Sequence, residues 1–163
     1  MNRIVQITPH FAVTGALRPD DLAEAARQGF RSVLSNLPDG ELRTSPSSAQ
    51  EGELAAGAGL GFRHIPVPRA EVFAAPVVSQ MRAVLGLLDP PILAHCASGQ
   101  RSALAWAAAA ASCQSADRVL AVLAAAGFDF EPLRAELEGL AGAWGGAIPT
   151  ALDVAYAGPP PGA

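Results

Sequence analysis

The feature of this sequence that most constrains its fold is an alanine-rich stretch, residues 102–112, preceded by a short apolar segment and a polar loop. The stretch is nearly all alanine with Leu104 and Trp106, so it predicts a helix that is apolar around most of its circumference and therefore buried. The apolar segment 92–94 predicts a short strand that leads into the loop. A strand, a loop and a buried helix in this order indicate a layered α/β domain built around the helix.

Strand and helix signals alternate along the rest of the chain. Turn residues and apolar runs predict strands within 4–14, at 30–35 and at 62–67. Capping residues, glycines and helical spacing predict helices at 19–28, 76–88, 116–126 and 131–141, with Ser115 as one cap. A further helix is opened by Ser45-Pro46-Ser47-Ser48 and fades at Gly57 and Gly59. Helices between short apolar strands predict a single α/β domain with a small, mainly parallel sheet flanked by helices.

The length of 163 residues suits one domain, which we place at 1–145. The remainder, 146–163, is rich in proline and glycine and is predicted to be a partly disordered tail. The start of the chain has no apolar secretory core, and no stretch reaches the length of about 18–20 apolar residues that a spanning helix needs. We therefore expect a soluble, cytoplasmic protein.

The charge of the chain excludes several classes of function. The net charge is −4, and the 11 basic residues are scattered, so we expect neither nucleic acid nor a membrane surface as a partner. All of the basic residues are arginine, which excludes Schiff-base chemistry and a Walker-type phosphate loop. Two cysteines provide no disulfide framework.

The loop after the strand at 92–94 is the candidate site. Ligands of open α/β sheets bind where strands end and helices begin, and a loop of backbone amides before a helix suits an anion. We expect Cys96 to be a thiolate nucleophile, favoured by the helix amino terminus and by Arg101. Arg101 would fork to the oxyanion of a substrate, Ser102 would hydrogen-bond the sulfur, and His95 would order the loop. The residues expected to line the anion cradle are Ala97, Ser98, Gly99 and Gln100.

The second cysteine, Cys113, has a different interpretation. It lies at the end of the alanine-rich helix, where a cysteine is typically a small buried hydrophobic residue. We assign no chemistry to it.

The loop and several other motifs resemble a bacterial family, the beta-lactamase-hydrolase-like phosphatase-like domain family (DUF442). The resemblance covers roughly residues 3–112 and rests on Ile7-Thr8-Pro9 with Val13-Thr14-Gly15, Asn36-Leu37-Pro38-Asp39-Gly40-Glu41, Pro46-Ser47-Ser48, His64-Ile65-Pro66-Val67 and His95-Cys96-Ala97-Ser98-Gly99-Gln100-Arg101-Ser102. It implies a dual-specificity phosphatase-like fold with no metal or organic cofactor. Members are labelled either as sulfurtransferases or as tyrosine phosphatase-like proteins, so the resemblance leaves the reaction open.

Two departures from the tyrosine phosphatase pattern favour sulfur chemistry. Four residues separate Cys96 from Arg101, where such phosphatases have five, and four is the length found in rhodaneses. Phosphatases of this fold also carry an acidic residue after the strand at 62–67, where this chain has Pro68 and Arg69. Asp39 and Glu71 are the remaining candidates for a proton donor, and Arg69 would suit an anionic sulfur donor. Sulfur transfer needs no such acid, because a thiolate is already a good leaving group.

Three hypotheses follow. The first is a sulfurtransferase that moves sulfane sulfur from thiosulfate or a glutathione or other low-molecular-weight persulfide through a Cys96 persulfide to a thiol acceptor. The second is a protein tyrosine or dual-specificity-type phosphatase that acts through a Cys96 phosphocysteine, and the third is a non-catalytic scaffold or redox sensor. The expected substrate is a small anionic sulfur or phosphate compound, and the resemblance implies a persulfide-handling enzyme as a partner.

Overall fold

The computed structural model describes residues 1–154, and the last part of the predicted tail, 155–163, lies outside the described residues. Within that range the strands form a five-stranded sheet in the order β1-β2-β5-β3-β4. β1 pairs antiparallel with β2, and all other neighbouring strands are parallel, as predicted. The strands are β1 (Val5–Thr8), β2 (Phe11–Thr14), β3 (Ser32–Ser35), β4 (Gly61–His64) and β5 (Ile92–His95).

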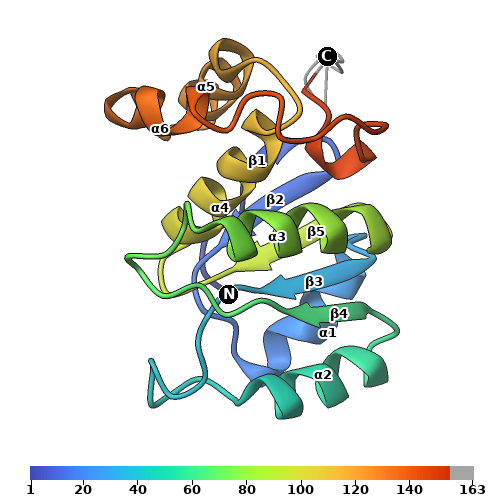
Figure 1. The fold of residues 1–163 in the computed structure, drawn as a ribbon. Coiled ribbons are helices and arrows are strands. Elements are labelled where there is room, and N and C mark those ends of the chain that lie inside the picture. The colour runs from blue at the N-terminus through green and yellow to red at the C-terminus, as the bar shows by residue number, and fades with distance from the viewer. Residues whose placement is uncertain (155–163) are drawn as a thin grey trace.

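Helices cover both faces of the sheet, which gives three layers. Alternate strand residues point to opposite faces, so Phe11 and Val13 of β2 join the larger core cluster and Ala12 joins the smaller one. The smaller cluster packs under α1 (Pro19–Arg27) and α2 (Ser48–Gly57). Figure 1 shows α3 and α4 lying across the other face. The elements on that side are α3 (Ala75–Leu87), α4 (Gln100–Ala111), α5 (Ala116–Ala125), the 3₁₀ turn η1 (Glu131–Leu133), α6 (Arg134–Glu138) and a second 3₁₀ turn, η2 (Thr150–Leu152).

The buried alanine-rich helix predicted from the sequence is α4. Its small side chains let it pack closely against α3 and α5, and its largest residue, Trp106, is fully buried. The Trp106 ring stacks on Phe11 of β2 with ring centroids 5.8 Å apart, and its Nε1 donates to the Ala151 carbonyl at 2.8 Å. α4 has only 12 residues, and within residues 1–154 no helix combines the length and apolarity needed to cross a membrane.

Several element boundaries differ from those predicted. β4 ends at His64 rather than at residue 67, because Pro66 has no N–H to donate to a neighbouring strand. The helix predicted at 131–141 is shorter and divides into η1 and α6, and it ends where Gly139 follows. Ser115 does precede α5, but its side chain makes no capping hydrogen bond.

The packed part of the chain extends past the predicted boundary at residue 145. Ala151, Leu152 and Val154 are buried in the larger core cluster, and η2 contacts both α3 and α4. Residues 151–154 of the predicted tail therefore pack onto the domain.

Candidate active site

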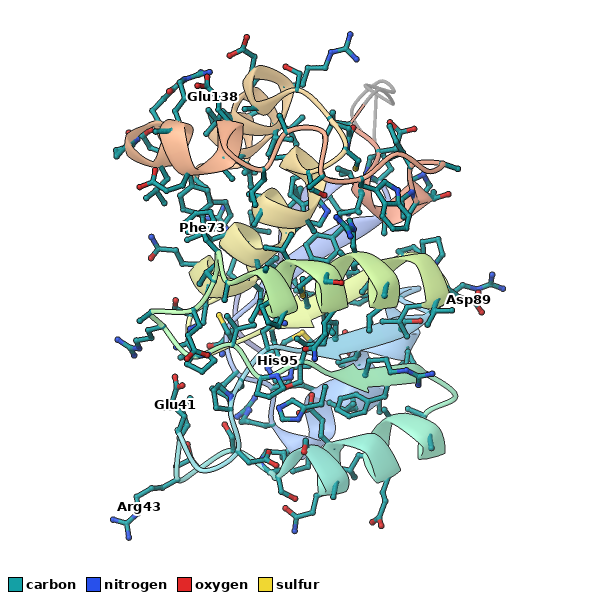
Figure 2. All side chains as sticks on the ribbon, viewed as in Figure 1. Glu41, Arg43, Phe73, Asp89, His95 and Glu138 are labelled. Carbon is teal, nitrogen blue, oxygen red and sulfur yellow. The ribbon has the colours of Figure 1, made fainter. Side chains whose placement is uncertain are left out.

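The register of the central strands brings the candidate residues together at one edge of the sheet. β5 lies between β2 and β3, and His95 is level with both Thr14 and Ser35. Because parallel strands end at the same edge, the residues that follow them, including Cys96 and Asn36, lie close together. Figure 2 shows His95 in the interior and Glu41 on a loop near the rim of the molecule.

The Cys96 loop folds so that a backbone amide points at the sulfur. Cys96 is fully buried, and its Sγ accepts a hydrogen bond from the Gly99 N–H at 3.1 Å. Gly99 has φ +92°, and a Cβ at this position would lie 3.1 Å from the Thr14 carbonyl oxygen. Both observations require glycine, because the left-handed conformation and the close approach exclude a side chain. The predicted loop thus exists, and α4 begins directly after Gly99.

The other loop residues lie at or near the surface. The Ala97 carbonyl accepts from the Ala16 N–H at 3.4 Å, which ties the loop to the segment after β2. Ser98 and Gln100 are exposed, and the Gln100 N–H donates to Ser98 Oγ at 3.4 Å.

Arg101 is held by two acceptors outside the loop. Its Nη1 and Nη2 donate to the two oxygens of the Glu41 carboxylate at 3.0 and 2.7 Å, and Nη1 also donates to the Val67 carbonyl at 2.9 Å. A guanidinium has five N–H donors, so these three bonds leave Nε–H and one Nη2–H, which lie along one edge of the group. That edge has the geometry for a second, bidentate anion. The Arg101 hydrogen bonds hold the pKa of the Glu41 carboxyl below its ordinary value.

His95 joins the central strand to α2. Its Nε2 lies 2.5 Å from Glu51 Oε1, and both side chains are almost fully buried. His95 Nδ1 is buried and has no hydrogen-bond partner among residues 1–154. A buried carboxylate needs a partner, so the ring satisfies Glu51 and at the same time fixes the residue before Cys96.

Ser102 does not contact the Cys96 sulfur, contrary to the prediction. Its Oγ donates to Asn36 Oδ1 at 2.9 Å, and both residues are buried. The Asn36 Nδ2 is bonded to the Ile65 carbonyl at 3.1 Å, which turns Oδ1 toward Ser102. Ser102 therefore anchors the first turn of α4 to the ends of β3 and β4.

The three accessory candidates have different environments. Asp39 accepts from the N–H and the hydroxyl of Ser48 at 2.7 and 2.8 Å, and these bonds lower the pKa of its carboxyl. Asp39 thus binds the start of α2 and is not placed as a proton donor. Arg69 and Glu71 are exposed on the turn after β4.

A hollow of about 490 Å³ lies beside the Cys96 loop. Its lining includes Ala97 and Ser98 of the loop, Gly15 after β2, Arg3 and Phe128. Among residues 1–154, no group of three or more His, Cys, Asp or Glu side chains is arranged to hold a metal ion.

Sequence reasoning missed three residues of this site. Glu41 and Glu51 are partners of Arg101 and His95, and Asn36 is the partner of Ser102. For Asn36 a signal existed, since a polar residue directly after a central parallel strand lies at the ligand-binding edge. Nothing in the spacing identifies Glu41 or Glu51, because both are distant in sequence from the residues they bind.

A buried cysteine in a strand-to-helix loop, followed by an arginine at the edge of a parallel sheet, is the arrangement of a phosphatase-like α/β domain. The family model described as "Beta-lactamase hydrolase-like protein, phosphatase-like domain" matches residues 3–113. The chain belongs to this family, as the resemblance indicated.

Known relatives support the same class. Beta-lactamase hydrolase-like protein of Xylella fastidiosa (strain 9a5c) is 32% identical over 105 residues, which is 64% of this chain. The match spans only about a quarter, 24%, of that relative's length.

Solved structures support the fold. A structure from Neisseria meningitidis z2491, named as that of a candidate phosphatase, is 29% identical with a TM-score of 0.71 and covers 84% of this chain and 97% of that one. The structure named Tk-PTP in the active form shares the fold at 23% identity and a TM-score of 0.62, covering 84% and 95% of the two chains. Together these findings support the phosphatase hypothesis better than the sulfurtransferase hypothesis.

Proposed function

We propose that this protein is a phosphatase that acts through a covalent phosphocysteine at Cys96. The observation that carries the proposal is the geometry around the sulfur, where the Gly99 amide points at Sγ and Arg101 of the same loop keeps one guanidinium edge for an anion. The family match and the phosphatase-like structural relatives support this proposal over sulfur transfer.

In the proposed reaction, the Cys96 thiolate attacks the phosphorus of a phosphate monoester. An S–P bond forms and the P–O bond to the leaving group breaks, while Arg101 and the loop amides bind the phosphoryl oxygens. Water then attacks the phosphocysteine, the S–P bond breaks, and phosphate and the thiolate are released. The Gly99 N–H stabilises the sulfur when it carries negative charge.

The test uses an aryl phosphate, because its leaving group depends least on a general acid. The purified protein should hydrolyse p-nitrophenyl phosphate, and acid quenching should trap an adduct of about 80 Da on Cys96. Cys96→Ser should abolish both results, and Cys113→Ser is the matched control that should preserve them. The absence of Cys96-dependent turnover of this and of every other phosphate probe at millimolar concentration would remove the proposal.

The sulfurtransferase hypothesis retains one specific observation, the four residues between Cys96 and Arg101. It predicts a gain of about 32 Da on Cys96 with thiosulfate or glutathione persulfide. The comparisons give no support to a thiol acceptor or to a persulfide-handling partner. If the sulfur adduct forms and the phosphate adduct does not, the assignment reverses.

A scaffold or redox-sensing role is the third outcome of the same assays, since neither adduct would then form. A cytoplasmic location is part of our proposal, because an unpaired catalytic thiol suits a reducing compartment.

A further inference from the structure

The groups around Cys96 supply positive charge but restrict the delivery of a proton. An alkoxide leaving group must be protonated as it departs, and a positioned general acid contributes typically about 10²–10⁴-fold to such a reaction. A leaving group that is stable as an anion has no such requirement. The carboxyl groups and cations around a site indicate which of these two kinds of leaving group the site suits.

The two carboxyl groups on the loop after β3 are both engaged. Asp39 accepts two hydrogen bonds from Ser48, and Glu41 forms the fork with Arg101. Hydrogen bonds to the charged form hold both pKa values below their ordinary range. Both groups are therefore ionised at neutral pH and hold no proton to give.

The buried pair of Glu51 and His95 is also unsuited to donate a proton to a leaving group. Glu51 and His95 bind each other at 2.5 Å, and their side chains are 4% and 1% exposed. Glu51 belongs to α2, and both side chains are closed off from solvent, so the pair is not open to a departing group.

Two arginines, in contrast, lie near Glu41: Arg101, which binds it, and Arg69. Arg101 keeps one edge without a partner among residues 1–154, and its Nη1 binds the Val67 carbonyl at 2.9 Å. Arg69 follows two residues later on the exposed turn after β4, close enough for its charge to lower the pKa of Glu41. A departing group with its own negative charge would meet Arg69, whereas a neutral alcohol would gain nothing from it.

We propose that the substrates are anhydride-type phosphates, either phosphoric anhydrides or acyl phosphates, whose leaving group departs as an anion and is bound by Arg69. This inference rests on the proposed phosphatase function. The Cys96 thiolate attacks the terminal phosphorus, the bridging P–O bond breaks, and its electron pair leaves with the phosphate or carboxylate without a proton. Water then cleaves the S–P bond and returns the thiolate and phosphate, so charge and atoms balance.

The test compares four probes with the purified full chain: inorganic pyrophosphate, acetyl phosphate, p-nitrophenyl phosphate and glycerol phosphate. We expect kcat/KM for at least one of the first two to exceed that for glycerol phosphate by about 10²-fold or more, the contribution of the missing acid. A preference for pyrophosphate or for acetyl phosphate identifies which anhydride is used. Rates with Cys96→Ser provide the background for spontaneous hydrolysis.

Substitution of Arg69 isolates the leaving-group contact. Arg69→Gln should lower kcat/KM for the preferred anhydride about tenfold more than for p-nitrophenyl phosphate, because the latter leaving group carries a delocalised charge. Arg118→Gln removes the same charge from an exposed position on α5 and is the matched control.

The outcomes separate the inference from the function on which it rests. Cys96-dependent turnover in which glycerol phosphate is as good as the anhydrides would refute the inference and retain the phosphatase. A Glu71→Gln variant that loses most activity, together with the basic limb of its pH profile, would identify an acid and also refute it. No Cys96-dependent turnover of any probe would refute the phosphatase itself.

Discussion

Replacing Glu41 tests whether this residue positions Arg101 or competes with substrate for it. Arg101 binds Glu41 through one hydrogen each of Nη1 and Nη2. The edge inferred to bind an anion is formed by Nε–H and the other Nη2 hydrogen. Glu41 and an anion can then bind the same guanidinium together. Glu41→Gln keeps the size of the side chain and removes its charge. Arg101 then loses the ion pair that orients it, while the volume available to it is unchanged.

The magnitude follows from the contacts. A hydrogen bond to a charged group contributes about 1.5–3 kcal/mol, and we reduce this to about 1–2 kcal/mol because the Glu41 side chain is 24% exposed to solvent. If that orientation is needed in the transition state, kcat/KM for p-nitrophenyl phosphate should fall about 5- to 30-fold. The inhibition constant for inorganic phosphate should rise in the same direction.

The pH dependence adds a second check. Because the folded pKa of Glu41 lies below its ordinary value of 4.5, the pair persists above that value and is lost as the pH falls through the lowered pKa. The ratio of wild-type to Glu41→Gln activity should therefore stay constant from neutral pH down to about pH 5. Glu53→Gln on the exposed side of α2 is the control. Tighter phosphate binding by Glu41→Gln would refute the argument, since it would mean that Glu41 competes for Arg101.

Three further changes test the surroundings of the site. Gly99→Ala should lower the free energy of unfolding by about 1–3 kcal/mol and abolish turnover. The reason is that φ is +92° and the new Cβ would lie 3.1 Å from the Thr14 carbonyl oxygen. An unchanged Tm would contradict this. Asn36→Leu should lower stability by about 2–4 kcal/mol in urea, since it leaves the Ser102 hydroxyl and the Ile65 carbonyl without their partner, and a loss below 1 kcal/mol would show that water replaces it. Burial raises the pKa of the Cys113 thiol, so its alkylation followed by mass spectrometry should be slower at pH 7 than in the urea-unfolded chain and should accelerate toward pH 9.

The sequence was sufficient to predict the layers of the fold, because each depends on local patterns. The alanine run could only be a buried helix, and short apolar strands between helices required a parallel sheet. Boundaries were less accurate where backbone hydrogen bonding rather than hydrophobicity decides them. β4 is an example, since Val67 still donates to the Asn36 carbonyl at 3.1 Å although the strand has ended at His64.

The residues of the site could be predicted from the sequence only where they lie together in one short segment. Cys96, Gly99 and Arg101 stand in one loop, so their order and spacing were informative. The hydrogen bond of Ser102 differs from the predicted one, because its hydroxyl donates to an asparagine 66 positions away. Such pairings depend on which side chains the folded sheet places opposite each other, and one sequence does not contain that information.

The partners of the loop share a segment of the chain, and this has a mechanical consequence. Asn36, Glu41 and Glu51 bind Ser102, Arg101 and His95 respectively, so residues 36–51 hold the Cys96 loop at three points. Two of these contacts are buried, and the Glu41 contact is partly open to solvent. Opening of the segment would therefore begin at Glu41 and release the guanidinium first, while His95 and Ser102 keep the loop in place. An anion on the remaining edge of Arg101 would oppose that opening, because it binds only the oriented guanidinium. Anion binding and the rigidity of residues 36–51 are thus linked, so each should increase the other.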